Sequence, residues 1–338
     1  MKKSIVIVGG GVIGCITAIE LKKKGFDITI IDKGQMAEGA SSAAGGILFP
    51  LMPWNYNEEV YDLCKKSDEY YGALTDELLY ETGINSEYKK SGLRIIAPLD
   101  KKIITKWAQE NKVNVLWGKN NKTEELLISE VSQISPNKLM DALRKFLIKI
   151  GVEIIVNRKV NNFKINNTEI SALYDDNQTS IQGDYYLITT GAWASELMPA
   201  FQNKVYPIRG QIIQYPKGSL DIDEIVYSNG TYVIQRADGA IIAGSTLEDV
   251  GFQPLQKKDK GDYMKDKVVK IFPQLEGVEI EKHWAGFRPG SFNNVPFIEK
   301  DRELSNLFYS VGHYRYGITM APKSAERLTE LIVNEAKA

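Results

Sequence analysis

Residues 3–32, KSIVIVGGGVIGCITAIELKKKGFDITIID, decide the fold of this chain. Residues 5–8 form an apolar, β-branched run, which is typical of a strand buried on both faces. Three glycines follow at the spacing GxGxxG, and they are Gly9, Gly11 and Gly14. Apolar residues at helical spacing then lead to Gly25, a helix C-terminal signal, and residues 27–31 supply a second apolar strand. The stretch therefore predicts one complete βαβ unit.

The glycines and the acid after the second strand predict a dinucleotide site. In such a unit the first glycine permits a tight turn, the second lets a pyrophosphate approach the backbone, and the third lets helix and strand pack closely. The diphosphate then lies at the positive end of the helix. Asp32 closes the second strand, where a carboxylate accepts hydrogen bonds from an adenosine ribose. We expect Val12 and Lys33 to contact the same ligand; the alternative is a glycine-rich turn that only packs.

Composition places the chain among ordinary globular proteins. Its 338 residues suit two domains, with 43% hydrophobic and 25% charged residues. The formal net charge of -1 gives no electrostatic case for binding nucleic acid or an anionic membrane. Cys15 and Cys64 fall in predicted helices, and we expect buried thiols in a reducing compartment rather than a disulfide.

The amino terminus has one feature of a secretory signal, because Lys2 and Lys3 precede an apolar run. Glycines interrupt that run, no convincing cleavage site follows, and the same residues are explained as a strand and turn. No other segment approaches the length of a membrane-spanning helix. We therefore expect a cytoplasmic protein, peripheral to a membrane at most.

Residues 34–54, GQMAEGASSAAGGILFPLMPW, predict a loop that lies against a long cofactor. Small residues expose backbone amides with little side-chain bulk, and the ones we expect at the cofactor are Ser41, Ser42, Ala43, Gly45 and Gly46. The alternative is a flexible surface loop, but the apolar residues that follow favour burial. An acidic ribose ligand followed by Ser-Ser-Ala-Ala-Gly-Gly resembles the flavin-dependent oxidoreductases of the D-amino-acid oxidase superfamily.

The middle of the chain predicts several further elements. Helices are expected at residues 57–83, 100–112, from Ser135-Pro136 to 150, and 259–272. Strands are expected at residues 87–98, 152–156, 160–165, 205–215, 225–227, 231–235, 240–243 and 279–287. The polar tract 119–123 is interpreted as a turn and a domain crossing.

A second landmark is residues 182–192, QGDYYLITTGA, an apolar strand followed by small residues. It resembles the second flavin-contact motif of the same superfamily, with Thr189 where that motif has alanine. The resemblance implies that Thr190 and Gly191 lie close to the cofactor. It also implies that backbone atoms near Val160 meet the adenine.

Three later segments are similar, in order and spacing, to glycine oxidases and their D-amino-acid dehydrogenase relatives. They are residues 232–247, YVIQRADGAIIAGSTL, residues 284–290, WAGFRPG, and residues 312–322, GHYRYGITMAP. The similarity covers nearly the whole chain and implies an α/β fold with a Rossmann-like FAD-binding domain. The second domain would be α+β and bind substrate on a mostly antiparallel sheet. The expected FAD-binding ranges are 1–86, 136–203 and 305–338, and the expected substrate-binding ranges are 87–135 and 204–304.

The resemblance also implies roles for individual residues. Arg288 would anchor the substrate carboxylate, since a guanidinium can hold a carboxylate with two parallel hydrogen bonds. Tyr232 would add a hydroxyl to that carboxylate, and Arg315 would lie beside the flavin or the site entrance. The alternatives are a solvated surface position for Arg288, sheet packing for Tyr232 and a structural ion pair for Arg315. The remaining expected flavin contacts are Gly312, Tyr314, Gly317, Ile318 and Thr319.

The implied chemistry is FAD-dependent oxidative deamination of glycine or a small D-amino acid. Hydride would pass from Cα to flavin N5, giving an imino acid and then an oxo acid, with O2 reduced to H2O2. The FAD would be non-covalent, because no cysteine follows Cys64 to form the thioether of sarcosine oxidases. With two histidines and no carboxylate cluster at ligand spacing, we expect no metal site.

Other functions remain open. One is a D-amino-acid dehydrogenase that passes electrons to a quinone, although the sequence shows no basic amphipathic helix. Another is a flavin-dependent oxidase that acts on the side chain of a modified tRNA base. The near-zero net charge argues against this function, because proteins that bind RNA usually carry a basic surface. A third is a non-catalytic flavoprotein. The partners expected are a small amino acid and an electron acceptor, and the sequence is compatible with a homo-oligomer.

Overall fold

A six-stranded sheet forms the base of the molecule in this computed structural model, which describes residues 2–36, 38–120, 123–253 and 258–337. Its strands, in spatial order, are β18 (Phe297–Lys300), β19 (Leu307–Val311), β12 (Tyr185–Ile188), β1 (Ser4–Val8), β2 (Asp27–Ile31) and β8 (Glu153–Ile155). Neighbours from β19 to β8 pair in parallel, and β18 adds an antiparallel edge. The predicted βαβ unit is therefore confirmed as the centre of this sheet.

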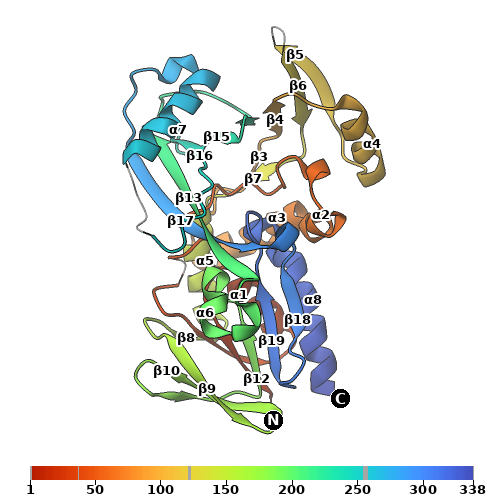
Figure 1. The fold of residues 1–338 in the computed structure, drawn as a ribbon, viewed down its shortest axis with the longest axis vertical. Helices are drawn as coiled ribbons and strands as arrows, with labels where there is room; N and C mark the ends of the chain where they lie inside the picture. The colour runs from red at the N-terminus through yellow and green to blue at the C-terminus, as the bar shows by residue number, and fades with distance from the viewer. Residues whose placement is uncertain (1, 37, 121–122, 254–257, 338) are drawn as a thin grey trace.

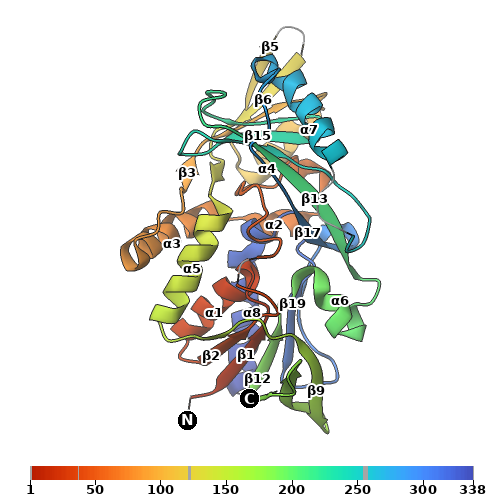
Figure 2. The ribbon, with the colours of Figure 1, turned by 90° about the vertical axis from the view of Figure 1, so that its left-hand side faces the viewer.

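Both faces of the six-stranded sheet are covered, because β1 alternates its apolar side chains between two cores. Ile5 and Ile7 pack against helices, while Val6 and Val8 face the opposite layer. The helices of the first layer are α1 (Val12–Lys23), α3 (Ser67–Thr82), α5 (Pro136–Lys149) and α8 (Gly317–Lys337). The opposite layer holds α6 (Ala194–Leu197) and a three-stranded antiparallel sheet of β9 (Val160–Asn166), β10 (Glu169–Asp175) and β11 (Ser180–Ile181). Figure 2 shows these two layers on either side of the sheet.

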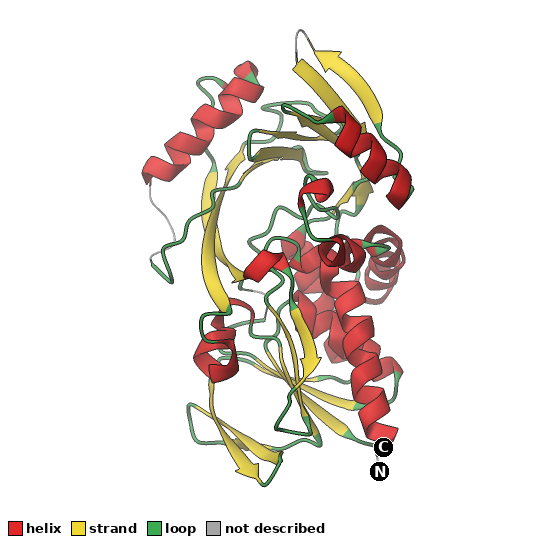
Figure 3. Cartoon of the chain, turned by 45° about the vertical axis from the view of Figure 1, so that its right-hand side comes forward, coloured by secondary structure: helices red, strands yellow, loops and turns green. Residues whose placement is uncertain are grey.

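An eight-stranded sheet forms the other half of the molecule, above the first sheet in Figure 1. In spatial order its strands are β17 (Lys282–Ser291), β13 (Val205–Tyr215), β16 (Ile241–Gly244), β15 (Thr231–Gln235), β14 (Ile225–Ser228), β4 (Leu93–Ile96), β6 (Thr123–Ile128) and β5 (Leu116–Asn120). The pair β14 and β4 is parallel, and the other recorded pairs are antiparallel. The sheet curves over the half that contains the six-stranded sheet, with α7 (Lys258–Ile271) and α4 (Lys101–Asn111) outside it (Figure 3). The expected α/β class with a mostly antiparallel second sheet is confirmed.

Short elements connect the two halves. β3 (Lys89–Lys90) pairs with β7 (Ser132–Gln133), and α2 (Glu58–Cys64) packs against α8. Single 3-10 turns occur at Pro53–Asn55, Gly191–Trp193, Pro199–Phe201, Pro273–Leu275 and Phe292–Asn294. β18 joins the six-stranded sheet, although its residues lie in the range expected for the substrate-binding half.

The interpretation of residues 119–123 as a domain crossing is wrong. Asn120 pairs with Thr123 across a hairpin of β5 and β6, so the chain turns back within one sheet. Residues 121–122 lie outside the described residues. A polar tract between two strands signals a turn but not which sheet the second strand joins.

Some predicted elements have other bounds than the sequence suggested. The helical region 57–83 is divided into α2 and α3, because Lys66 adopts a left-handed conformation with φ 61° between them. The strand expected from residue 279 begins at Lys282. Both thiols are buried in helices as expected, Cys15 in α1 and Cys64 in α2.

A proline inside α8 is accommodated by a distant tyrosine. Pro322 has no N–H, so it cannot donate to the carbonyl of Ile318, one turn earlier. The hydroxyl of Tyr71 in α3 donates to that carbonyl at 2.8 Å. The first turn of α8, which leads to the functional site, is thereby fixed to α3.

We expect Leu328→Ala to lower the free energy of unfolding by about 2–5 kcal/mol, because it opens a cavity between α8 and the core. Leu328 is 0% exposed, whereas Leu331 on the same helix is 38% exposed. The matched control Leu331→Ala should cost much less in urea or thermal unfolding. Equal losses for the two variants would contradict this view of the core.

Candidate active site

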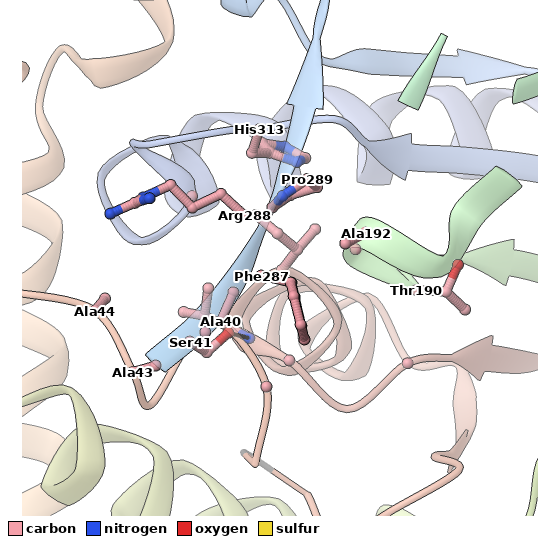
Figure 4. A pocket seen from close by; sticks show the side chains of 18 of the residues that line it. Ala40, Ser41, Ala43, Ala44, Thr190, Ala192, Phe287, Arg288, Pro289 and His313 are labelled. Carbon is pink, nitrogen blue, oxygen red and sulfur yellow. Dashed lines mark hydrogen bonds between the residues drawn. The ribbon is translucent and has the colours of Figure 1, made fainter. Parts of the chain in front are cut away.

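A cavity of ≈ 420 Å³ lies between the two sheets. One end is formed by the carboxyl ends of β1, β2 and β12, where parallel α/β sheets bind ligands at the point at which strand order reverses. The other end is formed by β13, β15 and β17 of the eight-stranded sheet and by the start of α8. Figure 4 shows the loop from Ala40 to Ala44 on one side of Phe287, with Thr190 and Ala192 on the other.

The glycine turn at the end of β1 leaves no room for side chains. Gly9 has φ +115°, and a Cβ there would lie 2.5 Å from the carbonyl oxygen of Thr189. A Cβ on Gly14 would overlap the carbonyl oxygen of Gly9, so α1 begins in direct contact with the strand. The hydroxyl of Thr189 donates to the carbonyl of Gly9 at 2.8 Å. This threonine, where the resembled motif has alanine, thus fastens β12 to the turn.

The loop after β2 is held against the same turn. Ser41 accepts a hydrogen bond from the amide of Val12, in the first turn of α1, at 3.0 Å. Asp32 accepts hydrogen bonds from the amides of Gly10 at 2.6 Å and Gly34 at 2.9 Å. Burial raises the pKa of Asp32 above its usual range, and the two amides oppose that rise. Asp32 therefore stands at the cavity wall with its orientation fixed by the backbone.

Aromatic side chains close one wall around Lys33. Its ammonium lies 3.4 Å from the ring centroid of Trp193, a cation–π contact. Trp193 stacks on Phe252 at 5.0 Å and meets Phe287 edge-on at 6.1 Å. Burial lowers the pKa of Lys33 to about 8. Trp193 and Phe287 line the cavity and come from different halves of the molecule.

The lining fits a flavin dinucleotide. Two buried hydroxyls in the cavity wall, those of Thr190 and Ser310, have no hydrogen-bond partner among the described residues. Buried polar atoms are rarely left without partners, so these positions suit a polar ligand. The glycine turn offers backbone at one end, and α8 begins with Gly317 in the cavity lining at the other.

Arg288 enters the cavity from β17. Its guanidinium lies over Gly210 of the neighbouring strand β13, where any Cβ would overlap the guanidinium atoms. One terminal nitrogen donates to the hydroxyl of Ser245 at 2.6 Å, and the other donates to the carbonyl of Thr246 at 3.2 Å. Burial lowers the pKa of Arg288 from its usual value. Its recorded acceptors are neutral, and no described acid lies within ion-pair distance of it.

Tyr232 lies beside Arg288, on β15. It is 6% exposed, and a Cβ on Gly45 would lie 2.5 Å from its hydroxyl oxygen. Burial raises the pKa of Tyr232, although Arg288 opposes the rise, so the phenol stays protonated at neutral pH. A protonated phenol can donate to a carboxylate held by Arg288.

An acid, Glu248, lies two residues after Thr246, whose carbonyl accepts a hydrogen bond from Arg288. Glu248 accepts hydrogen bonds from Arg209 at 2.7 Å, Gln211 at 2.9 Å and Thr246 at 2.6 Å. Burial alone would raise the pKa of Glu248, but these three donors lower it to about 2. Because Thr246 presents its carbonyl to Arg288, the network around Glu248 positions one of the two groups that orient the guanidinium.

Arg315 also lines the cavity, between β19 and α8. Within the described part of the chain, no hydrogen-bond acceptor or ion-pair partner is recorded for its guanidinium, so the alternative of a structural ion pair is not observed. Burial opposes its charge, and the groups that act on it next most strongly are tyrosines: Tyr316, Tyr56, Tyr227 and Tyr314. Arg288, Tyr232 and Arg315 line the same cavity, where the charge of Arg315 adds to the lowering of the Arg288 pKa by burial and opposes the raising of the Tyr232 pKa by burial.

Arg236 supports the cavity wall, although it borders the separate small cavity, and the sequence did not single it out. Its guanidinium donates to the carbonyls of Gly45 at 2.6 Å and Ile134 at 2.9 Å, and to the side chain of Gln133 at 3.1 Å. Burial lowers its pKa to about 10. It fastens the loop that carries Gly45 and Gly46, called the glycine loop below, to the eight-stranded sheet. Arg236 directly follows the apolar strand β15, and neither it nor Gly210 and Ser245 carried a local signal of these contacts.

The structure brings most of the expected site residues into one cavity. Those that line it are Arg288, Tyr232, Arg315, Gly9, Gly11, Val12, Asp32, Lys33, Ser41, Ala43, Gly45, Gly46, Val160, Thr190, Gly191, Tyr314, Gly317, Ile318 and Thr319. Three expected cofactor contacts do not line it. Gly14 packs against Gly9, Ser42 borders a separate small cavity of ≈ 140 Å³, and Gly312 forms a turn with φ +84°. A small residue near a ligand site can either contact the ligand or allow close backbone packing behind the contacting residues. Sequence spacing does not distinguish these two roles.

His313 lines the cavity as a buried neutral base. Its Nε2 lies 3.1 Å from the hydroxyl of Ser324, and burial lowers its pKa to about 3. Among the residues that the structure describes, no group of three or more His, Cys, Asp or Glu side chains could hold a metal ion. The described helices include none that is both long and apolar enough to cross a bilayer.

The glycine turn, the acid after β2 and the long cavity between two sheets define a class of proteins that bind a flavin dinucleotide. A family model described as "DAO: FAD dependent oxidoreductase" matches residues 4–331, and the chain belongs to this family of FAD-dependent oxidoreductases. It is therefore a flavoenzyme whose cofactor is FAD.

Two relatives are glycine oxidases of Pseudomonas. The one from Pseudomonas aeruginosa is 31% identical, and the alignment covers 98% of this chain and 95% of the relative. The one from Pseudomonas putida is 30% identical with the same coverage. A solved glycine oxidase from Bacillus cereus superposes with a TM-score of 0.89 at 23% identity, covering 98% of this chain and 95% of that one, which shows the shared fold.

We expect Arg236→Met to loosen the glycine loop and weaken retention of FAD. The carbonyls of Gly45 and Ile134 would lose a charged donor, which should cost about 1.5–3 kcal/mol in free energy of unfolding. Flavin content after gel filtration and the midpoint of thermal unfolding measure both effects. The control Lys217→Met removes an exposed ion pair with Asp238 and should change either quantity little.

We expect Glu248→Gln to alter the acid sensitivity of the fold. The pKa of Glu248 is depressed in the folded state, so its stabilisation is complete above about 4.5 and is lost as the pH falls toward about 2. The variant should be less stable at neutral pH by about 1–3 kcal/mol, and the difference should shrink on acidification. Urea unfolding across this pH range measures it, and a difference independent of pH would contradict the assignment.

Proposed function

We propose that the protein oxidises the amine of glycine or a small D-amino acid, whose carboxylate is bound by Arg288. The observation that carries the proposal is a cavity-facing guanidinium held by neutral acceptors, without an acid beside it among the described residues. A buried cation left without a counter-charge is costly, so the site favours an anionic ligand. The similarity to glycine oxidases supports an α-amino carboxylate as that ligand.

The geometry of Arg288 suits a carboxylate. Two of its five N–H donors are used by Ser245 and Thr246, which leaves donors on both terminal nitrogens for a paired contact. The protonated phenol of Tyr232 adds a donor beside it. Such a clamp fixes the Cα hydrogen of the substrate relative to the reactive ring and reduces the entropy cost of reaction.

The rest of the cavity supplies a dry environment. Apolar side chains from two segments line it, namely Ile47, Phe49, Leu51 and Ile212. When bound, FAD supplies the hydride acceptor, and the chain contributes placement and electrostatics. The amine needs no protein acid with a shifted pKa in this scheme, because a substrate that binds as the neutral amine can lose its Cα hydrogen directly.

The electron acceptor we propose is O2, with H2O2 as product. The alternative acceptor is a quinone, which would make the protein a dehydrogenase. Anaerobic mixing of the flavoprotein with glycine, sarcosine and D-amino acids tests the substrate, because an oxidised substrate bleaches the flavin. Admitting O2 and measuring peroxide then tests the acceptor. Failure of every amino acid to bleach the flavin would overturn the proposed substrate class.

We expect Arg288→Met to bind FAD but to lose activity on the best substrate of that panel. Loss of a buried, charge-assisted carboxylate contact corresponds to about 3 kcal/mol, or roughly 100-fold in kcat/KM. Arg302→Met is a matched control, since Arg302 is exposed and remote from the cavity lining. Steady-state kinetics with flavin content as a check measure the effect, and unchanged kinetics would remove Arg288 from the site.

A further inference from the structure

The cavity contains a second cation that one carboxylate does not explain. Arg288 accounts for a single anionic group, yet Arg315 lines the same cavity. No acceptor is recorded for any N–H of Arg315 within the described part of the chain, and none of the recorded ion pairs includes it. Burial is the main cause of the lowered pKa of Arg288, and the charge of Arg315 in the same cavity lowers it further.

The surroundings of Arg315 hold its charge without neutralising it. After burial, the groups that act on it most strongly are phenols rather than carboxylates, and they belong to Tyr316, Tyr56, Tyr227 and Tyr314. Tyr316 and Tyr56 are committed to each other through a 2.7 Å hydrogen bond between their hydroxyls. Two like charges facing one cavity repel each other, so both are stabilised together by a ligand that carries two negative groups.

Glycines make room for the side chains of Arg288 and Tyr232 in this cavity. Gly210 lies beneath the guanidinium of Arg288, and Gly45 leaves room for the hydroxyl of Tyr232. Tyr232 and Tyr314 line the same cavity as the two arginines, and the charges of both arginines oppose the rise that burial causes in the pKa of each phenol. A ligand that is anchored at Arg288 and reaches Arg315 would therefore find phenol donors in the cavity wall.

We infer that the preferred substrate is an amino dicarboxylate, with one carboxylate on Arg288 and the second on Arg315. This rests on the proposed function, because it names the substrate class of the same site. Glycine and D-alanine fill only the first position. Aspartate and glutamate carry a second carboxylate on a short chain and match both cations.

Binding of simple dicarboxylates to the holoenzyme tests the two-cation site without turnover. Malonate, succinate and glutarate are compared with acetate, propionate and butyrate through the change that each causes in the flavin absorption spectrum. We expect one dicarboxylate to bind at least about tenfold more tightly than its monocarboxylate counterpart, as a charge-assisted contact gives. The preferred chain length reports the separation of the two guanidinium groups. Equal affinities in the unmodified protein would overturn the inference with no variant needed.

Variants assign the second contact. In Arg315→Met the advantage of the dicarboxylate should disappear, and Arg315→Lys should restore part of it. In Arg288→Met the binding of both the dicarboxylates and the monocarboxylates should weaken. In the exposed control Arg302→Met the binding of neither group should change. An advantage that survives Arg315→Met, or a loss shared equally by the two series, would overturn the role given to Arg315.

Turnover separates this inference from the proposed function. Both enantiomers of aspartate and glutamate are compared with glycine and D-alanine by kcat/KM. A ratio that favours an acidic amino acid and falls at least about tenfold in Arg315→Met supports the inference. Reduction of the flavin by glycine without preference for an acidic amino acid would overturn this inference and keep the proposed function. Reduction by none of the amino acids would overturn the proposed function itself.

Discussion

Direct backbone contact at the glycine turn is the constraint on which the rest of the structure depends. Gly14 touches the carbonyl of Gly9, and Gly9 lies against the backbone of Thr189, at distances that no Cβ could tolerate. The start of α1, the end of β1 and the end of β12 therefore meet without side chains between them. This contact creates a floor of backbone groups at the carboxyl edge of the sheet, where a diphosphate can approach. The cavity extends from this floor to the second sheet.

The second sheet contributes charge. Arg288 is held by a hydroxyl and a carbonyl, while Glu248 lies one step behind it and is engaged by Arg209. Separating the acid from the cation keeps positive potential directed at the cavity, because an acid in contact with Arg288 would satisfy it internally. Arg236 serves a different purpose, since its donors are consumed by the backbone carbonyls that shape the glycine loop. Buried arginines in this fold thus divide into those that build the cavity and those that face into it.

Most elements could be predicted because their signals are local. The apolar run of β1, the glycines after it and the proline-led start of α5 each specify a conformation within a few residues. The errors arose where a distant contact decides. The polar tract 119–123 predicts a turn, but only the pairing of β5 with β6 shows that both strands belong to one sheet. Likewise, the helical periodicity of the sequence continues through Lys66. The left-handed conformation of this residue, which divides α2 from α3, leaves no trace in that periodicity.

The sequence by itself determined the βαβ unit and the flavin-binding class, and it predicted Arg288 and Tyr232 as site residues, because each rests on a short motif with a fixed chemical use. Only the tertiary structure decided that Gly210 makes room for a guanidinium, that Arg236 ties the glycine loop, and that Arg315 has no acid beside it in the described chain. These facts depend on which strands become neighbours. Counter-charges and close contacts come from segments far apart in sequence, and no local pattern records which of them meet.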